Sequence, residues 1–296
     1  MAQITASDVN KLRGMTGVSM MECKKALVQT DGDLDAAVKL LRELGIAVAA
    51  KRAEKAANQG IIAAKASADG AKIAMVEVNC ETDFVARNAD FVKFVDTVAE
   101  RALAEGENVA ESLKDELASR ISAIGENLKI RRSAVYALQG AGRLASYIHM
   151  GGKVGVIVEV GCTKAETAGN AAFVEMVKDL TLQIAASSPR WLDRTQVPAD
   201  VVAAEREIYA NQMKDQNKPA NILEKIIDGK VNKFYSEVCL VDQVFVKDSA
   251  LSIQKLMDAL RQATDDYTRM LAERGEDPAA RFDRSEQQGR QITGDQ

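Results

Sequence analysis

Few residues in this sequence are able to do covalent or metal chemistry. The chain has 296 residues, with a single histidine, His149, and four cysteines, Cys23, Cys80, Cys162 and Cys239. No two cysteines have the Cys-x-x-Cys spacing that zinc and iron–sulfur sites use, and no second histidine is present to complete a ligand set or a catalytic triad. We therefore predict no metal, no cofactor and no enzymatic reaction, and we expect reduced thiols packed mostly in the core.

The run at 81–87, Glu-Thr-Asp-Phe-Val-Ala-Arg, places an aromatic ring beside an acid. An internal repeat makes this run unusual, because a shift of 82 residues aligns 74–104 with 156–186 without a gap. The second copy reads Thr-Lys-Ala-Glu-Thr-Ala-Gly at the same place, so Glu166 stands where the first copy has Phe84. A requirement of the fold should act on both copies, which indicates a role specific to the first. Two interpretations stay open: Phe84 closes its local core, or it is an exposed anchor for a partner's pocket.

Two other classes of function stay open. A cysteine-dependent enzyme would need Cys80 or Cys162 as a nucleophile beside His149, although the matching positions of the two cysteines in the repeat favour packing. A non-catalytic RNA- or ribosome-associated module would use basic residues, and its RNA binding would depend steeply on salt. The candidate basic residues are Lys51, Arg52, Lys55, Arg131 and Arg132.

The overall composition argues against general nucleic-acid binding and against membrane insertion. The chain carries 39 Lys and Arg against 43 Asp and Glu, a net charge of −4, and only 4% aromatic residues. Surfaces that bind nucleic acids are usually basic and use stacking rings. No apolar run approaches the ~20 residues that span a bilayer, and the N-terminus lacks a signal-peptide pattern. We expect a soluble, cytoplasmic protein with no nucleic-acid or membrane partner.

Two related subdomains, 56–140 and 141–277, must position the two copies of the repeat. In each copy a β-rich run leads through a short connector into an amphipathic helix. The first sheet is expected from strands at 61–66, 72–78 and 128–138, with a helix at 110–124, and the second from strands at 145–149 and 154–160. The pattern predicts an α+β fold made of two antiparallel sheets, each with helices packed on it.

The first 55 residues predict a small helical module that leads into a linker. Ser19 and Glu22 have the spacing of a capping box, Asp33 can cap a third helix, and Gly45 suits the position just after that helix. Three short helices of this kind form a compact bundle of the ubiquitin-associated type, which binds partners and rarely catalyses. Lys24 on the second helix belongs either to a solvated face or to a partner contact. A helical linker is expected at 47–58.

A helical hairpin is predicted at 197–235, inside the second subdomain. Pro198 and Pro219 each suit a first helical turn, and the bend falls at 217–218. The hairpin carries an apolar stripe beside charges, so it either pairs two molecules as a homodimer or packs back onto its own core. The last segment, 278–296, is rich in Arg, Asp, Gln and Gly and is expected to be a disordered tail.

Several motifs of the chain occur in the order found in one known family. The run Thr82-Asp83-Phe84-Val85 resembles the signature of the bacterial elongation factor Ts family, and the resemblance extends over about 4–260. The other matching motifs are Met15-Thr16-Gly17 with Met20-Met21-Glu22-Cys23-Lys24-Lys25-Ala26-Leu27, Gly125-Glu126-Asn127 with Ile130-Arg131-Arg132, Tyr147-Ile148-His149, and Glu237-Val238-Cys239-Leu240 with Phe245-Val246.

The resemblance implies a guanine-nucleotide exchange factor for the GTPase elongation factor Tu, with no reaction of its own. It implies that Asp83 and Phe84 face the GTPase domain, with the Phe84 ring wedged between helices near the magnesium site. Thr82 and Val85 complete this site. Displacing a helix there would disturb the shell around Mg²⁺ and remove charge neutralisation from the GDP phosphates, so that GDP leaves.

The resemblance also implies secondary contacts with the partner. Lys24 and the N-terminal module would lie on the GTPase domain, and the second subdomain around His149 would lie on another domain of the partner. Ile130 is a further candidate contact, with core packing as its alternative, and for His149 a surface or core role without contact stays open.

The C-terminal part departs from the family pattern. Where relatives have a strand of the type Phe-x-Arg-Phe followed by Gly-Glu-Gly, this chain has Tyr267-Thr268-Arg269-Met270-Leu271 and then Gly275-Glu276-Asp277. We expect an altered strand here, which leaves open how the second sheet is completed.

Overall fold

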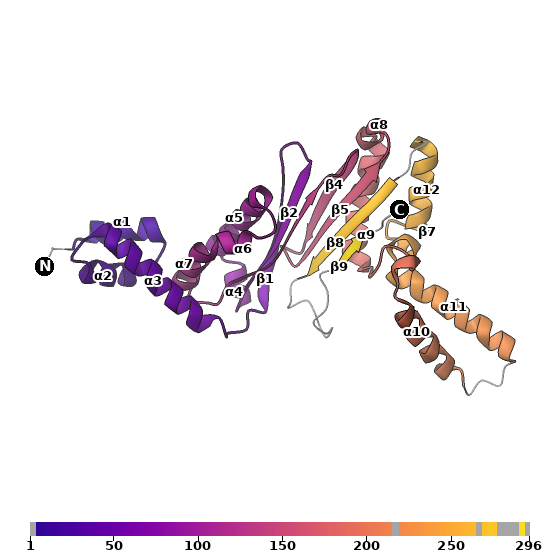
Figure 1. Cartoon of the computed structure of the whole chain (residues 1–296), viewed down its shortest axis with the longest axis horizontal. Helices are drawn as coiled ribbons and strands as arrows, with labels where there is room; N and C mark the ends of the chain where they lie inside the picture. Colours follow the sequence, from indigo (N-terminus) through magenta and orange to yellow (C-terminus); the bar gives the residue numbers. More distant parts are fainter. Residues whose placement is uncertain (1–3, 215–218, 265–267, 277–289, 294–296) are drawn as a thin grey trace.

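The computed structural model describes residues 4–214, 219–264, 268–276 and 290–293. Figure 1 shows an elongated molecule with a helical module at one end, two sheets in the middle and a helical hairpin that projects at the other end. Helices lie on the outer side of each sheet, so the middle has four layers in the order helix, sheet, sheet, helix. The predicted α+β class is confirmed. No helix of the described residues is both long and apolar enough to cross a membrane.

The N-terminal module consists of α1 (Ala6–Thr16), α2 (Met20–Gln29) and the first part of α3 (Leu34–Arg52). Ser19 caps α2 and Asp33 caps α3, as the sequence predicts. The prediction that α3 ends at Gly45 is wrong. Gly45 is buried where α3 crosses α7 (Lys114–Ile124), and the continuing contact with α7 keeps the chain helical up to Arg52. The buried apolar side chains of the module are Val9, Leu12, Val18, Cys23, Ala26, Leu27, Ala37 and Leu41.

The first sheet has the strand order β1-β2-β3 and is antiparallel throughout. Its strands are β1 (Gln59–Ala66), β2 (Lys72–Cys80) and β3 (Lys129–Ala137), close to the predicted bounds. Between β2 and β3 the chain forms α4 (Asp83–Ala86), α5 (Ala89–Glu105), α6 (Val109–Ser112) and α7. The helix predicted at 110–124 is therefore split in two, at Leu113, whose side chain enters the core.

The second sheet has the order β4-β5-β8-β9. Strands β4 (Gly142–His149) and β5 (Val154–Cys162) begin or end up to three residues beyond the predicted bounds. The sheet is contacted by α8 (Ala165–Gly169) and α9 (Ala171–Ser187), and α9 is contacted in turn by α12 (Ile253–Thr264). A small hairpin precedes α12 and consists of β6 (Val244–Phe245) and β7 (Asp248–Ser252).

The C-terminal region completes the second sheet. Strand β8 (Thr268–Glu276) pairs with β5 along nine residues, so the altered sequence keeps the strand. Strand β9 (Arg290–Thr293) pairs with β8. The prediction of a disordered tail is wrong for 290–293, because the open edge of β8 supplies backbone partners that a polar composition does not reveal. The rest of that segment, 278–289 and 294–296, lies outside the described residues.

The inner faces of the two sheets pack against each other. Ile62 and Met75 of the first sheet contact the second at Gly155, where a Cβ atom would lie 2.6 Å from Ile62 Cγ2 and 2.7 Å from Met75 Sδ. The β4–β5 turn also docks on β1, because the Gly152 carbonyl accepts a hydrogen bond of 2.8 Å from Ile62 N–H. The two subdomains therefore share a small core. Its buried members are Ile62, Ile73, Met75, Tyr136, Leu144 and Ile157.

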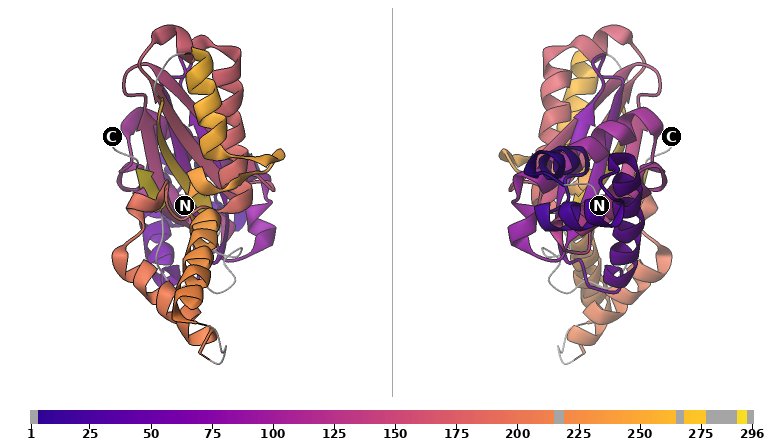
Figure 2. Two further views of the ribbon diagram at one scale, coloured as in Figure 1. Left: turned by 90° about the vertical axis from the view of Figure 1, so that its right-hand side faces the viewer. Right: turned by 90° about the vertical axis from the view of Figure 1, so that its left-hand side faces the viewer.

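The predicted hairpin consists of α10 (Ala199–Gln212) and α11 (Ala220–Val238), which pack along each other. Figures 1 and 2 show that α10 and α11 extend away from the two sheets. An ion pair of 2.7 Å between Arg206 and Asp228 joins the two helices, and Phe234 is buried at the base. The alternative that the hairpin packs back onto the core holds only for the base. The predicted bend at 217–218 lies outside the described residues.

Candidate functional site

The connector between β2 and α5 exposes one aromatic ring. Helix α4 is a single turn, and its residues face opposite ways: Ala86 is buried and Val85 packs against the first core, whereas 83% of Phe84 is exposed. The interpretation that Phe84 closes its local core is therefore wrong. An isolated exposed phenylalanine of this degree is a feature that a partner's pocket can use as an anchor.

The start of the connector is fixed by Glu126, which follows α7. One carboxylate oxygen, Oε2, accepts hydrogen bonds from the backbone N–H groups of Glu81 (3.1 Å) and Thr82 (3.0 Å), and Oε1 accepts one from the Thr82 hydroxyl (2.6 Å). The Thr82 hydroxyl in turn accepts a bond of 3.4 Å from Val85 N–H, which caps α4. Bonds to an ionised acceptor are stronger than neutral ones. The backbone that carries Phe84 is thus held by a side chain from a distant part of the sequence.

Glu81 makes the reverse connection. Its carboxylate accepts hydrogen bonds from Asn127 N–H (2.6 Å) and from the Arg52 guanidinium (3.0 Å). These partners hold the pKa of Glu81 below its ordinary value, with the Asn127 bond as the main cause. The side chain of Asn127 also donates to the Lys55 carbonyl (2.6 Å). The connector, the α7–β3 turn and the end of α3 therefore form one hydrogen-bonded unit.

Asp83 lies beside the ring and is available at the surface. Its carboxylate pairs with Arg87 one turn later at 3.2 Å; the Arg87 side chain is largely exposed and that of Asp83 is about half exposed. Exposed pairs of this kind contribute little to stability, about 0.3–0.5 kcal/mol. Asp83 can therefore exchange this partner for one on another protein at small cost.

The second copy of the repeat has a similar helical turn without the aromatic ring and without a side-chain cap. Helix α8 begins after Lys164, which makes no side-chain capping bond, and Glu166 is exposed at the position of Phe84. Thr167, at the position of Val85, is buried. The inward side of the turn is therefore kept in both copies, whereas the outward aromatic and the side-chain cap belong to the first.

The other predicted residues lie apart from the connector. Lys24 is exposed on α2, in the N-terminal module, and beside it in sequence Met20 and Met21 are exposed too. His149 is exposed at the end of β4, where its ring stacks on Tyr147 (5.6 Å between centroids) and its Nδ1 is 2.8 Å from the Tyr147 hydroxyl. The structure does not bring Lys24 or His149 into one site with Phe84 within this chain.

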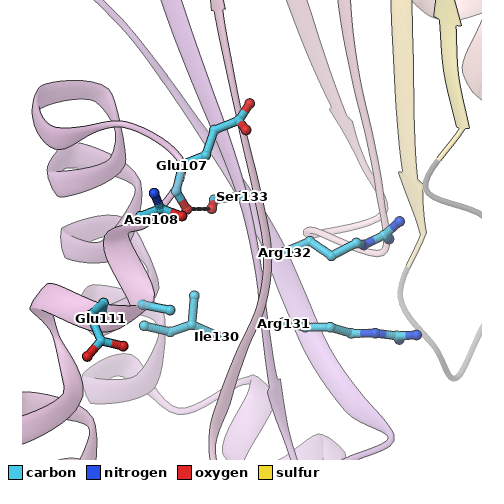
Figure 3. A pocket seen from close by; sticks show the side chains of 8 residues that line it. Glu107, Asn108, Glu111, Ile130, Arg131, Arg132 and Ser133 are labelled. Atoms are coloured by element: carbon cyan, nitrogen blue, oxygen red, sulfur yellow. Dashed lines mark hydrogen bonds between the residues drawn. The ribbon is translucent and has the colours of Figure 1, made fainter.

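Ile130 is almost entirely core. Only 8% of it is exposed, and it packs with the first core, so any partner contact through this side chain would be small. Its exposed edge borders a surface hollow of about 440 Å³ between α6 and the edge of β3 (Figure 3). Glu107 and Glu111 line the same hollow, and the Ser133 hydroxyl donates to the Glu107 carbonyl across it.

With this geometry in view, comparison with known proteins decides the family. The family model described as Elongation factor TS matches residues 81–274, which include the Phe84 connector and the whole second subdomain up to β8. The chain belongs to the elongation factor Ts family. Elongation factor Ts of Trichlorobacter lovleyi is 44% identical over 269 residues, covering 86% of both chains. Those of Methylococcus capsulatus and a Nitratiruptor species are 46% and 42% identical, covering 86–88% of each chain. The family consists of translation elongation factors.

The structure argues against the alternative that the chain is an RNA- or ribosome-associated module. Arg131 and Arg132 both reach the buried carboxylate of Glu77, at 3.2 Å and 2.6 Å. A bulge in β3 opposite Glu77 turns both arginines to the same side of the strand, away from the hollow (Figure 3). Arg52 is paired with Glu81. Three of the five basic residues considered for RNA are thus engaged with carboxylates.

The structure also argues against a cysteine-dependent enzyme, because neither candidate cysteine is placed to act as a nucleophile beside His149. His149 pairs with Val154 at one end of β5 and Cys162 lies at the other end, eight residues or about 26 Å away. Cys80 is fully buried and donates to the Thr82 carbonyl (3.1 Å). Among the described residues no group of three or more His, Cys, Asp or Glu side chains is arranged to hold a metal ion.

Sequence reasoning missed the roles of Glu81 and Glu126. Glu126 stands in the motif Gly125-Glu126-Asn127 and Glu81 directly precedes Thr82, but nothing in the spacing shows that two segments 44 residues apart meet. For Glu81, the signal that could have found it is the repeat itself. Copy one has an acid and a threonine at 81 and 82, where copy two has Thr163 and Lys164.

Proposed function

We propose that this chain is the guanine-nucleotide exchange factor of the GTPase elongation factor Tu. It binds elongation factor Tu·GDP, displaces Mg²⁺, promotes release of GDP and so allows GTP to bind. The observation that carries the proposal is the exposed ring of Phe84, on a helical turn that Thr82 caps. The chain that carries this ring belongs to the elongation factor Ts family.

The proposed action is binding, without a reaction on this chain. Phe84 inserts between helices of the GTPase domain, while Thr82, Asp83 and Val85 set the depth and direction of insertion. The insertion shifts the partner's shell around Mg²⁺, and without the cation the GDP phosphates lose their charge compensation. Factor and nucleotide weaken each other by the same free energy, because the coupling between two ligands is reciprocal.

The remaining parts of the chain supply affinity in this proposal. The N-terminal module (1–55), with Lys24, docks on the GTPase domain next to the first subdomain (56–140). The second subdomain (141–277), with the exposed turn at His149, docks on another domain of the partner. Ile130 contributes at most the edge of its side chain. The site of action is the cytoplasm, with no cofactor, nucleic acid or membrane involved.

Release of a fluorescent GDP from elongation factor Tu tests the proposal. The wild-type chain should accelerate release, and Phe84→Ala should lose about thirtyfold or more, as expected when a dominant interface anchor is truncated. Glu166→Ala is the matched control at the same place in copy two and should act like the wild type. An inactive wild type would refute the function, and a fully active Phe84→Ala would refute the wedge.

A homodimer through the 197–235 hairpin stays a prediction. Ile208 on α10 and Ile222 on α11 are exposed large apolar residues on this arm. Light scattering over a range of concentrations tests it: a strict monomer would rule the dimer out.

A further inference from the structure

We infer that Glu126 is a positioning residue for Phe84, which fixes the connector backbone so that the ring is presented before the partner arrives. The inference rests on the proposed function and adds to it a residue on a different segment from the ring. Glu126 uses both carboxylate oxygens on this task, through the three hydrogen bonds to Glu81 and Thr82.

The first argument is the state of the Thr82 hydroxyl. A hydroxyl has one proton to donate and two lone pairs. Because that proton goes to Glu126 Oε1 at 2.6 Å, the lone pairs are left to accept from Val85 N–H, and this bond starts α4. Glu126 therefore sets the orientation of the cap, and through the cap the direction of the one-turn helix that carries Phe84.

The second argument comes from the reciprocal contact. Glu126 binds the backbone at 81 and 82, while Glu81 binds the backbone N–H of Asn127 at 2.6 Å. Two carboxylates from segments far apart in the sequence thus hold each other's turns. A four-residue helix has too few internal bonds to be stable by itself. Its order must come from outside, and these contacts supply it.

The third argument is the second copy of the repeat. Helix α8 forms after Lys164 with no side-chain capping bond, and it presents Glu166. The fold therefore makes this turn without the capping contact. Its presence in copy one is explained by what that copy carries: a large ring that must stay out of its own core and in one direction. Holding a binding residue in its bound conformation lowers the cost of association.

The test compares Glu126→Ala and Glu126→Gln with the wild type in the full chain. GDP release from elongation factor Tu is measured over a range of factor concentrations, and amide hydrogen exchange of 81–85 is measured in the free chain. For Glu126→Ala we expect the half-saturating concentration to rise about fivefold to tenfold, the effect of losing one strong cap, and the Thr82 and Val85 amides to exchange faster.

The conservative variant and a matched control separate positioning from general damage. In Glu126→Gln the amide oxygen can still accept from both backbone N–H groups. The amide NH2 can donate to the Thr82 hydroxyl, which keeps a second lone pair for Val85 N–H, so this variant should stay within about twofold of the wild type. Glu116→Ala removes another carboxylate, on α7, that pairs with Arg120 one turn away, and should leave both readouts unchanged. Slow exchange at 82–85 in Glu126→Ala would overturn the inference.

A double variant tests whether Glu126 acts through the ring. In a Phe84→Ala background, Glu126→Ala should cause no further loss of exchange activity, because no ring is left to position. Losses that multiply would show an independent role and overturn the inference. If Glu126→Ala does not fold, Thr82→Val, which removes only the hydroxyl, takes its place with the same expected directions. An inactive wild type would refute the proposed function, whereas an active wild type with a fully active Glu126→Ala would refute only the positioning role.

Discussion

The two copies of the repeat share their scaffold down to individual hydrogen bonds. Asn88 and Asn170 each cap the long helix of their copy by accepting from two backbone N–H groups. Cys80 and Cys162 each donate from sulfur to the carbonyl two residues on, at 3.1 Å and 3.3 Å. These features fix where the strand ends and where the helix begins, so both copies need them.

The copies differ on the outward side of the connector. Copy one has Phe84, the Thr82 cap and the contacts with Glu126, and copy two has Glu166 and no side-chain cap. The comparison separates residues that make the fold from residues that use it. A turn that both copies keep is scaffold, and what is added on one copy only marks the face that meets the partner in the function proposed above.

The largest effect should come from making copy one resemble copy two. Phe84→Glu removes the ring and introduces a charge where the proposed pocket is apolar. We therefore expect it to reduce the acceleration of GDP release by more than the about thirtyfold expected for Phe84→Ala. Stability should stay near that of the wild type, because the side chain is exposed. The reverse change, Glu166→Phe, should not add activity. If Phe84→Glu kept full activity, the division between the two copies would be wrong.

The next effect concerns the inner faces, where the copies also differ. Ile73 of β2 corresponds to Gly155 of β5, and the missing side chain at 155 lets the two sheets approach. Gly155→Ile would make the copies alike but overfill the contact with Ile62 and Met75. We expect a loss of about 3 kcal/mol in the free energy of unfolding by urea.

A second glycine serves as the control for this prediction. At Gly169 an added Cβ atom would meet open space, with no heavy atom within 4 Å, so Gly169→Ala should be neutral or slightly stabilising. Equal stability of Gly155→Ile and the wild type would show that the sheets can separate without cost.

Local patterns predicted the secondary structure well and the tertiary contacts poorly. The strands of the first sheet lie within two residues of their predicted bounds, because alternation and turn residues are local signals. Gly45 was misread as a helix end, since only the packing of α3 on α7 shows why the helix continues. Strand β9 was missed because its partner is an edge formed elsewhere in the chain.

The candidate site divides in the same way. Comparing the two copies identified Phe84 from the sequence alone, because it is an aromatic residue where the aligned second copy has the acid Glu166. Its exposure depends on which side of α4 faces the core, and the sequence left this open. The role of Glu126 could not be predicted from the sequence, because its hydrogen bonds connect two segments that no periodic pattern or motif spacing relates to each other.

A smaller effect should be equal in both copies, because it belongs to the scaffold. Asn88→Ala and Asn170→Ala each remove an N-cap with the same two hydrogen bonds. We expect each to lower the free energy of unfolding by about 1 kcal/mol. Urea unfolding checks both values, and unequal losses would mean that the shared features do not carry equal weight.

The smallest effect is a dependence of stability on pH that Glu81 gives to the connector of copy one. Asn127 N–H and the Arg52 guanidinium lower the pKa of Glu81 in the folded chain, while copy two has Thr163 there. A carboxyl with a lowered folded pKa stabilises the fold fully above its unfolded value of about 4.3. This contribution is lost as the pH falls through the folded value.

Urea unfolding from pH 7 to pH 3 of the wild type and Glu81→Gln measures this contribution. Above about pH 5 the two stability curves should run parallel, because the wild-type carboxyl is ionised in both the folded and the unfolded chain. Below that pH the wild type should lose more stability than Glu81→Gln, because only the wild type takes up a proton at this position on unfolding. Curves that stay parallel down to pH 3 would show that the bonds of Glu81 to Asn127 and Arg52 do not favour its ionised form.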